Sequence, residues 1–406
     1  MASSEPEPLH HPDAGPRTSA LGLYVHIPFC TAICNYCNFN RGLYDASLKT
    51  RYVEALCAEI AGSEDPAYIG SDRADPSTRD PLRADTIYFG GGTPSLLDPA
   101  EVSSIIRIIR DRFAVDSDSE ITLETNPETV DRARLERFLE AGVNRLSFGV
   151  QSFQDEELKR LGRIHSAERA RRAVTEARAA GFANVSLDLM MWLPGQSVET
   201  WLRNVDALIG AGPDHASLYL LELYPNAPLK EDMARGGWSL APDDDAAEMY
   251  LRAMERLEGA GLEQYEISNV ARPGRRSRHN LKYWTDGEWL AFGCGAHATY
   301  GGVRWKNVAG TEDYINRVTN RVSPIGERRV LTRGERLEET LFTGLRLTEG
   351  IDVEAAGRDY GIDVFEKYGD ALQPFIDARW LVREGGRLRL TRDGMLMANE
   401  VMAVFV

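Results

Sequence analysis

Residues 23–37 have the sequence LYVHIPFCTAICNYC, in which a short apolar run leads into three closely spaced cysteines. The apolar, β-branched residues predict a buried strand. Cys30, Cys34 and Cys37 follow as C-x3-C-x2-C, a spacing that random placement of the five cysteines would give in roughly four of ten thousand shuffles. The spacing therefore indicates a shared task for the three thiols.

The residues between the cysteines are mostly polar, among them Thr31 and Asn35, so the thiols do not follow the face of an apolar core. Three thiolates on a cubane iron–sulfur cluster leave one iron without a protein ligand, and a chelating small molecule can bind there. We therefore predict that the cysteines hold such a cluster. Two alternatives are a zinc site, for which His26 is the local fourth ligand, and three core thiols.

Strand and helix patterns alternate through the first 225 residues. Short apolar runs predict strands over 21–27, 85–89, 120–125, 145–150, 185–190 and 216–223. Helical periodicity predicts helices over 47–60, 99–113, 131–140, 167–180 and 198–209. This alternation is typical of a parallel sheet with helices packed outside it. Six such units are too few for an eight-fold barrel, so we expect an α/β fold with a partial, open (β/α)6 barrel over residues 21–240.

The remainder of the chain has a different pattern. Residues 241–320 begin with a predicted helix over 243–259 and continue as an irregular region, rich in Gly, Arg and aromatics, to about residue 310. We expect this segment to cover the barrel. Within residues 321–406, a helical stripe and an alternating run over 387–391 predict a small α+β, winged-helix-like C-terminal domain. The stripe consists of Leu337, Leu341, Phe342 and Leu345.

Composition narrows the class of protein. The chain of 406 residues carries 62 acidic and 47 basic side chains, a net charge of −15, which argues against nucleic acid as the main partner. Residues 325–406 hold 12 basic and 15 acidic residues, whereas a DNA-binding wing would need the opposite sign. No apolar run approaches the ~18 residues that span a bilayer, so no transmembrane segment is expected; peripheral contact with a membrane stays open.

Two stretches are predicted to lie outside the folded core. Residues 1–20 lack the apolar segment of a secretory signal and predict a disordered tail, and residues 63–84 predict a surface insertion. The odd number of cysteines makes a disulfide framework improbable and favours a reducing cytoplasm.

Unusual residues stand at the ends of the predicted strands, where a parallel barrel places its chemistry. The second strand ends in GGGTP over 90–94, and its glycines allow a ligand to approach the backbone. Glu124 ends the third strand and Asp188 lies in the fifth, each among apolar residues. A buried carboxylate is costly unless partnered, so each is expected to meet a ligand or a cation, with a structural ion pair as the alternative.

The cysteine spacing resembles the hallmark of the radical S-adenosylmethionine (SAM) superfamily, in which an electron from a [4Fe–4S] cluster cleaves SAM to a deoxyadenosyl radical. Five further runs resemble the oxygen-independent coproporphyrinogen III oxidase family: YVHIPFC (24–30), GGGTPS (90–95), ETNPE (124–128), GVQSF (149–153) and LGRIH (161–165). The resemblance implies that the cluster-bound SAM contacts Tyr24, Tyr36, Gly91 and Glu124. It also matches positions that the oxidases use partly for a second SAM, which are here Gly92, Thr93, Gln151, Arg163 and Asp188.

Two features resemble the HemW branch of that family, the haem chaperones, more than the oxidases. Phe39 stands where the oxidases carry a fourth cysteine, and only about twenty residues precede the first strand. The run HNLKYW over 279–284 matches the H-N-x-x-Y-W motif of the branch, and His279 is the implied haem ligand, with His297 a second candidate. A nearby basic cluster suits the haem propionates: Arg272, Arg275, Arg276, Arg278 and Lys282.

The resemblance implies a cytoplasmic haem chaperone that binds a [4Fe–4S] cluster, SAM and haem. Its implied partners are a haem-acceptor protein and an electron donor for the cluster. The alternative is an enzyme, an oxygen-independent coproporphyrinogen III oxidase that decarboxylates propionates in porphyrin biosynthesis. A non-catalytic, cluster-containing interaction module is a third reading. The sequence leaves open whether SAM is cleaved or only bound, and which acceptor receives haem.

Overall fold

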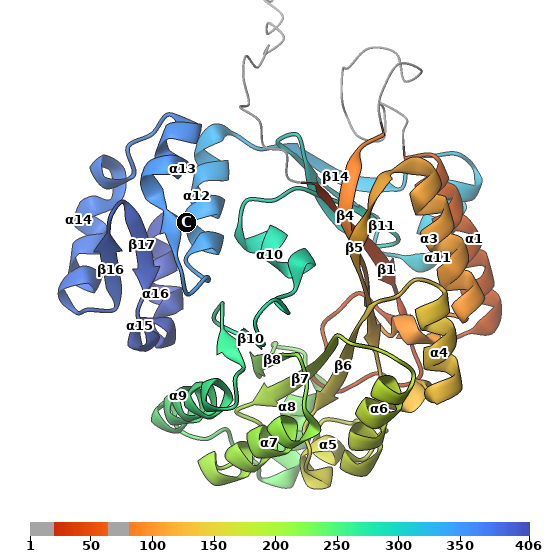
Figure 1. The fold of residues 1–406 in the computed structure, drawn as a ribbon, viewed down its shortest axis with the longest axis horizontal. Coiled ribbons are helices and arrows are strands. Elements are labelled where there is room, and N and C mark those ends of the chain that lie inside the picture. The colour runs from red at the N-terminus through yellow and green to blue at the C-terminus, as the bar shows by residue number, and fades with distance from the viewer. Residues whose placement is uncertain (1–19, 64–80) are drawn as a thin grey trace, which may run out of the picture.

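The predicted strand–helix units build one curved sheet. The computed structural model describes residues 20–63 and 81–406, so the predicted tail, except for Ala20, and most of the predicted insertion lie outside the described residues. Within the described residues, a sheet of 12 strands has the order β14-β13-β12-β11-β1-β4-β5-β6-β7-β8-β10-β9 (Figure 1). This arrangement confirms the α/β class and the partial barrel.

The barrel strands run parallel and lie in chain order. They are β1 (Leu21–Ile27), β4 (Arg83–Gly91), β5 (Ala114–Thr125), β6 (Arg145–Gln151), β7 (Val185–Met191) and β8 (His215–Leu220). The last predicted strand was too long, because the chain leaves β7 after Leu221, which still donates its N–H to Met191 at 3.1 Å.

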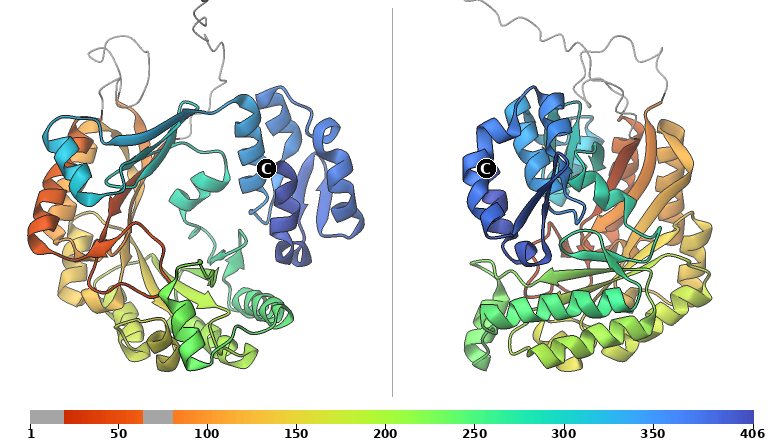
Figure 2. Two further views of the ribbon diagram at one scale, coloured as in Figure 1. Left: turned by 180° about the vertical axis from the view of Figure 1, so that it is seen from behind. Right: turned by 60° about the vertical axis from the view of Figure 1, so that its left-hand side comes forward.

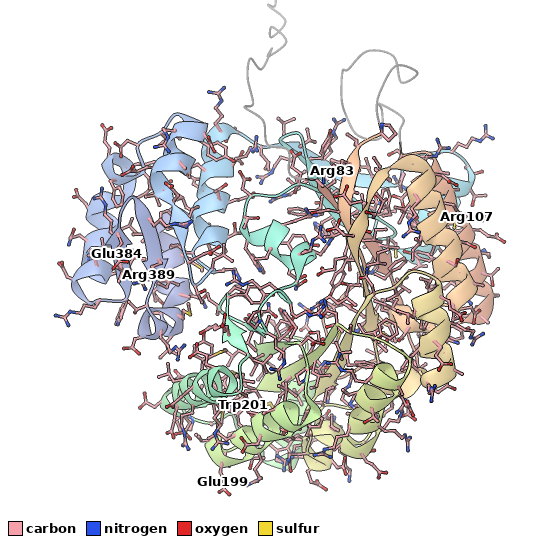
Figure 3. The ribbon with its side chains drawn as sticks, viewed as in Figure 1. Arg83, Arg107, Glu199, Trp201, Glu384 and Arg389 are labelled. Carbon is pink, nitrogen blue, oxygen red and sulfur yellow. The ribbon has the colours of Figure 1, made fainter. Side chains whose placement is uncertain are left out.

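Helices cover the outer face of the sheet (Figure 1). They are α1 (Ala46–Ala61), α3 (Pro99–Arg112), α4 (Arg132–Glu140), α5 (Asp155–Arg160), α6 (Ala167–Ala179) and α7 (Val198–Ala211). Their starts are encoded locally: Asp98 and Glu101 form a capping box on α3, for example. On α7, Glu199 points away from the molecule, whereas Trp201 is buried and donates to the carbonyl of Met249 (Figure 3).

The two faces of the barrel differ in chemistry. Leu23, Val25 and Ile27 of β1 are fully buried against the helices. The alternate positions face the inside and are polar or aromatic, as in Tyr24 and His26. A polar inner face is unusual for a parallel sheet, whose strands are normally apolar on both sides. The polar inner face is suited to binding a polar ligand inside the barrel.

The region that was expected to be irregular extends the sheet instead. After α8 (Pro228–Gly236) and α9 (Asp243–Gly259), the chain adds β9 (Glu263–Gln264) and β10 (Asn269–Ala271) to one edge. On the other edge, β11 (Trp289–Phe292) pairs in parallel with β1, followed by β12 (His297–Tyr300) and β13 (Val303–Asn307). The last strand on this edge, β14 (Ile325–Val330), also belongs to the large sheet, although the sequence assigns residues 321–406 to the C-terminal domain. Strands β11, β12 and β13 have only four or five residues each, and glycines separate them. Such short runs show no clear alternation of apolar and polar residues.

A further helix, α10 (Arg278–Trp284), lies inside the curve of the sheet, whereas α11 (Thr311–Thr319) packs on α1 outside it (Figure 1). The position of α10 matters for the site, because this helix carries the HNLKYW motif.

The C-terminal module lies across the open side of the barrel (Figures 1 and 2). Its helices are α12 (Arg333–Gly344), α13 (Val353–Tyr360), α14 (Val364–Asp377), α15 (Arg392–Leu396) and α16 (Ala398–Met402). Its antiparallel sheet contains β15 (Ile351–Asp352), β17 (Arg387–Leu390) and β16 (Leu381–Glu384). The predicted stripe holds for Leu337, Leu341 and Leu345, which are fully buried, but Phe342 is 36% exposed and lies off that face.

Candidate functional site

A cavity of about 780 Å³ opens at the carboxyl ends of the barrel strands. Three parts of the chain line it. The barrel contributes Tyr24, Gly91 and Glu124, and the loop after the third cysteine contributes Asn38, Phe39 and Asn40. The opposite wall comes from α10 and the sheet extension, with Tyr283, Trp289, His297 and Lys306. The volume is in the usual range for a ligand pocket, about 300–1,000 Å³.

The cysteine loop lies beside this cavity, between the paired strands β2 (Phe29–Cys30) and β3 (Gly42–Leu43). Each thiol has a different neighbour. Thr93 Oγ1 lies 3.6 Å from Cys30 Sγ, and Arg163 Nη1 lies 3.4 Å from Cys34 Sγ. Burial raises the pKa of Cys30 and of Cys37, and the nearby Arg41 guanidinium opposes that effect at both. Soft thiolates flanked by guanidinium groups suit an iron–sulfur cluster.

The zinc alternative finds no support in the geometry. His26 Nδ1 lies 3.1 Å from the Tyr24 hydroxyl and Nε2 lies 2.8 Å from the Asn40 carbonyl oxygen, so both ring nitrogens are occupied. Among residues 20–63 and 81–406, no three His, Cys, Asp or Glu side chains lie so that they could hold a single metal ion directly, and this includes Cys30, Cys34 and Cys37. His26, the fourth ligand that the sequence offers for zinc, is already engaged by protein groups.

The glycine run brings the end of β4 against the cysteine loop. A Cβ on Gly92 would lie 2.7 Å from the Phe29 carbonyl oxygen and 3.0 Å from Cys30 Sγ, so a larger residue would push the loop away. Gly91 has a φ of +115°, which side chains rarely adopt. The run is therefore required for the packing of the loop, whether or not it also contacts a ligand.

Glu124 and Asp188 are buried carboxyl groups on the inner face of the barrel. Glu124 accepts hydrogen bonds from the Tyr88 hydroxyl at 2.9 Å and from the Gly91 N–H at 3.0 Å. Desolvation raises the pKa of Glu124 to about 7 and that of Asp188 to about 6. Neither forms an ion pair within 4 Å among the described residues, although Arg145 lies near enough to both, and Arg163 to Asp188, to oppose the rise in pKa, and both stay candidates for ligand binding.

Two other predicted residues, Cys34 and Tyr36, lie beside Arg163. Its guanidinium donates to the Gly149 carbonyl oxygen at 2.5 Å and to Cys34, and it lies beside Tyr36, where burial raises the pKa of the phenol. Gln151 ends β6 with a φ of +68°, a strained conformation for a residue with a side chain. Its Oε1 is buried without a hydrogen-bond partner among the described residues. Strain and an unpaired polar atom together point to a functional position.

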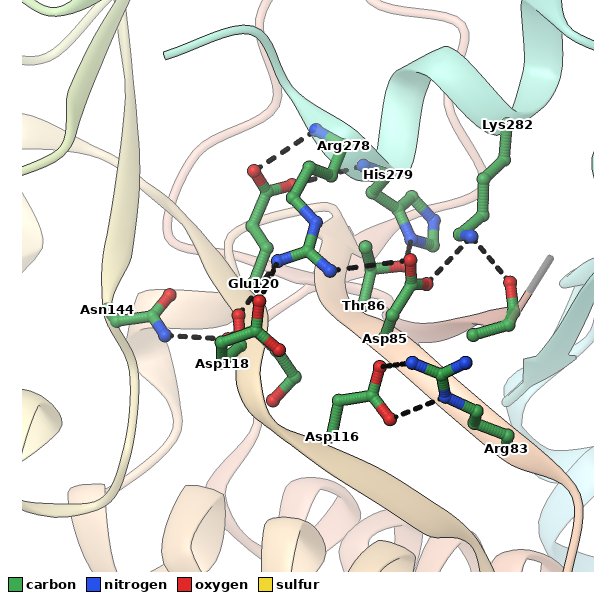
Figure 4. Close-up of polar contacts among 12 residues, drawn as sticks. Arg83, Asp85, Thr86, Asp116, Asp118, Glu120, Asn144, Arg278, His279 and Lys282 are labelled. Atoms are coloured by element: carbon green, nitrogen blue, oxygen red, sulfur yellow. Dashed lines mark hydrogen bonds and ion pairs between the residues drawn. The ribbon is translucent and has the colours of Figure 1, made fainter. Parts of the chain in front are cut away.

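His279 lies one layer away from the cavity, next to Thr86 of β4 and Glu120 of β5, in a region that we call the lower end of the barrel (Figure 4). Its ring stacks on Tyr88 at 5.0 Å, and its neighbour Tyr283 lines the cavity. The Glu120 carboxylate accepts the N–H groups of Arg278 and His279 at 3.1 Å each, which anchors the start of α10. The imidazole is 1% exposed. Its Nδ1 lies 2.8 Å from Thr86 Oγ1 and its Nε2 lies 2.9 Å from the Tyr283 hydroxyl. In this arrangement neither ring nitrogen is free for an iron atom.

Two members of the predicted basic cluster, Arg278 and Lys282, are engaged by acidic groups of the protein. Lys282 Nζ lies 2.7 Å from Asp85 and donates to the Ala20 carbonyl at 2.6 Å, and Arg278 lies 3.4 Å from the same aspartate (Figure 4). Arg276 stacks over the Tyr265 ring. Arg278 and Lys282 therefore join α10 to the sheet, whereas Arg272 and Arg276 are exposed and stay candidates for contact with propionates.

Sequence reasoning missed several residues that shape the site. Tyr88 and Ser147, which hydrogen-bond to Glu124 and Asp188, alternate with the apolar positions of their strands, and that alternation was the available signal. Trp289 was also missed; it packs edge to face at 4.7 Å against Tyr283, which belongs to the predicted HNLKYW motif. Lys306 lay in the region expected to be irregular and offered no signal.

Comparisons with known proteins agree with this geometry. The family model described as "Radical SAM superfamily" matches residues 24–208, and the one described as "HemN C-terminal domain" matches residues 331–397. The chain is 34% identical over 384 residues to the Bacillus subtilis "Heme chaperone HemW", covering 94% of this chain and 98% of that protein. The chain belongs to the HemW family within the radical SAM superfamily.

A second HemW relative, from Mycobacterium tuberculosis, is 34% identical and covers 97% of both chains. The solved structure of coproporphyrinogen III oxidase (HemN) from Escherichia coli superposes with a TM-score of 0.82 over 95% of this chain and 90% of that one, at 22% identity. That likeness shows a shared fold and confirms the small C-terminal module. Radical SAM membership implies a [4Fe–4S] cluster and SAM as cofactors of this HemW-family chain.

Within residues 20–63 and 81–406, no helix combines the length and the apolar character that crossing a membrane requires.

Proposed function

We propose that this chain is a haem chaperone, which binds a [4Fe–4S] cluster, SAM and haem and passes the haem to an acceptor protein. The observation that carries the proposal is the match to proteins named heme chaperone HemW along almost the entire chain. The cavity supports it, because it is lined by polar barrel residues at one end and by aromatic residues at the other.

Cys30, Cys34 and Cys37 hold the cluster in this proposal. When bound, the cluster supplies the electron that cleaves SAM in this superfamily. Arg163 and Arg41 lie beside the thiols and oppose the accumulated negative charge of thiolates. Gly92 keeps the loop close to the end of β4. The electron donor is a separate protein or small reductant, and the exposed loop provides the approach to the cluster.

Glu124 and Tyr24 bind the polar end of SAM from the cavity wall. Tyr88 and the Gly91 amide orient the Glu124 carboxyl, and burial holds its pKa near 7. Near neutral pH the ionised Glu124 carboxylate can therefore accept a hydrogen bond from an ammonium group, and the protonated carboxyl can donate one to a carboxylate. The remaining candidate residues lie beyond the cavity wall, toward the cysteine loop, β6 and β7, and would contact SAM from there: Tyr36, Thr93, Gln151, Arg163 and Asp188. A reducing compartment such as the cytoplasm suits all five cysteines, which are free thiols.

The second candidate is the oxygen-independent coproporphyrinogen III oxidase, favoured by the fold of its Escherichia coli representative. Against it stands Phe39 at the position of the further cysteine that the oxidase resemblance implies. Phe39 is 65% exposed and lines the cavity, so an apolar ring replaces a potential thiol in the site itself.

Anaerobic reconstitution of the full chain with iron and sulfide separates the two functions. We expect haem titration to produce a saturable Soret band and transfer to an apo-acceptor. We expect no protoporphyrinogen from coproporphyrinogen III with SAM and a reductant. Sustained decarboxylation would show that the chain is the oxidase, and absence of any saturable haem binding would rule out the chaperone.

A further inference from the structure

We propose that haem binds against the sheet extension, with the His297 imidazole as the iron ligand and the Lys306 ammonium paired with a propionate. The inference rests on the proposed function, since it names where and how the chaperone would hold its cargo. It moves the haem site from the HNLKYW helix, which the sequence indicated, to the mouth of the cavity.

The geometry places the two side chains together. His297 begins β12, and Lys306 lies directly opposite it on β13 in the antiparallel register. Directly opposed residues project from the same face of a sheet with their Cβ atoms about 4.5–5.5 Å apart. Both residues line the cavity that also contains Tyr24 and Glu124. An imidazole and an ammonium group therefore face the same space as the proposed SAM site.

His297 differs from every other histidine that the structure describes. His26, His165, His215 and His279 are all buried, and each has at least one ring nitrogen within hydrogen-bond distance of a protein group. His297 is exposed to the cavity, and neither of its ring nitrogens has a hydrogen-bond partner in residues 20–63 and 81–406. An imidazole that is accessible and unpartnered is a suitable axial ligand for haem iron.

Aromatic side chains from more than one wall of the cavity supply surfaces for the macrocycle. Trp289 packs edge to face with Tyr283, and its Nε1 donates to the His297 carbonyl oxygen at 2.8 Å, which fixes the start of β12. Phe39 and Tyr224 are 65% and 39% exposed at the mouth. Exposed aromatic rings around an open cavity suit a flat, apolar ligand with polar edges.

The charges facing this wall favour an anionic edge near Lys306. Arg304, on the same face of β13, is already paired with Glu339 at 2.6 Å. Glu327 lies opposite Lys306 on β14 and is the acidic neighbour that a propionate would compete with. Lys306 forms no ion pair with the described residues, so its charge is available to a carboxylate.

The test is haem titration of the anaerobically reconstituted full chain, followed by absorbance and electron paramagnetic resonance. We expect His297→Ala to remove the imidazole-ligated haem signature and to weaken binding by about tenfold or more. Free imidazole added to this variant should restore the signature. Because His297 is exposed, the variant should fold, and an unchanged cluster absorbance checks this.

The outcomes separate the inference from the proposed function. If the unmodified chain binds haem and His297→Ala binds it with the same spectrum and affinity, the ligand assignment is wrong while the chaperone proposal stands. If His279→Ala alone removes the signature, the HNLKYW helix is the haem site. If the unmodified chain binds no haem, the chaperone proposal itself fails.

Lys306 has its own matched control. Lys306→Gln should weaken binding of haem several-fold with an unchanged ligand spectrum, and should have no effect on binding of haem dimethyl ester, which lacks the charged propionates. Lys230→Gln, at an exposed position on α8, serves as the control and should change neither. Equal weakening for both ligands would show that Lys306 does not pair with a propionate.

Discussion

The two ends of the barrel both carry buried polar residues but differ in how far the protein satisfies their hydrogen bonds. At the carboxyl ends of the strands, which we call the upper end, Glu124, Asp188 and Gln151 are buried with raised pKa values or an unpaired atom, next to a cavity. At the lower end, His279 and Lys282 are buried with their polar atoms satisfied by the protein. The sequence suggested a ligand site at both ends, from glycines and carboxylates at the upper end and from a histidine and basic residues at the lower end. The two ends differ in how many of their polar atoms already have a hydrogen-bond partner in the protein. A group whose donors and acceptors are all paired cannot bind a ligand without losing a protein contact.

The largest effect is expected from the cysteine loop at the upper end. Cys34→Ala should abolish the broad iron–sulfur absorbance and the inorganic sulfide of the reconstituted chain, since a cubane with one open corner cannot spare a thiolate. Iron and sulfide analysis measures the result. Cys57→Ala is the matched control, because Cys57 is only packed beside the core on α1. Retention of sulfide in the Cys34 variant would exclude the triad as ligands.

The second effect concerns the lower end. His279→Ala should reduce the free energy of unfolding by about 2–4 kcal/mol, because the Thr86 and Tyr283 hydroxyls lose a buried partner and a cavity forms. Urea denaturation measures it. Haem affinity should change less than twofold when compared at a temperature where the variant is folded.

His297→Ala is the control for that experiment and should leave stability almost unchanged, because its side chain is exposed. A His279 variant with native stability but no haem binding would reverse the comparison, and the lower end would then be the ligand site.

Much of the barrel could be predicted because local patterns encode it. The strand over 21–27 coincides with β1, and the helix over 243–259 with α9. The sheet extension could not be predicted, since β11, β12 and β13 have only four or five residues each and are stabilised by pairing with β1 and with one another. Tertiary pairing of this kind leaves no periodic pattern in the sequence.

The candidate site was predictable to the extent that unusual residues end strands. Gly91 and Glu124 were found in this way, and the structure joins them by a hydrogen bond. The surroundings of His279 could not be foreseen, because Thr86 and Glu120 reach it from strands far away in the sequence. Spacing identifies a residue worth attention, but only the packing shows which of its atoms are free.

The third effect is pH-dependent and belongs to the upper end. Desolvation raises the pKa of Glu124 from 4.5 to about 7, so the folded chain retains a proton that the unfolded chain has released between those pH values. Stability therefore falls as pH rises through this window. Glu124→Gln lacks this titration, so its stability relative to the unmodified, cofactor-free chain should rise by about 1–3 kcal/mol between pH 5 and pH 8. A pH-independent difference would mean that Glu124 stays ionised throughout.

The smallest effect comes from an ion pair at the edge of the lower end. Arg83 Nε and Nη2 each lie 2.8 Å from Asp116, but the arginine side chain is 63% exposed, so water and salt screen the attraction (Figure 4). Arg83→Gln should leave the urea midpoint within the scatter of repeated measurements. The contrast with the Lys282–Asp85 pair is burial, since the Lys282 side chain is only 10% exposed. If Arg83→Gln lowered the free energy of unfolding as much as His279→Ala, the exposed and the buried ion pairs of the lower end would be coupled in one network. The distinction between buried and exposed pairs would then be wrong.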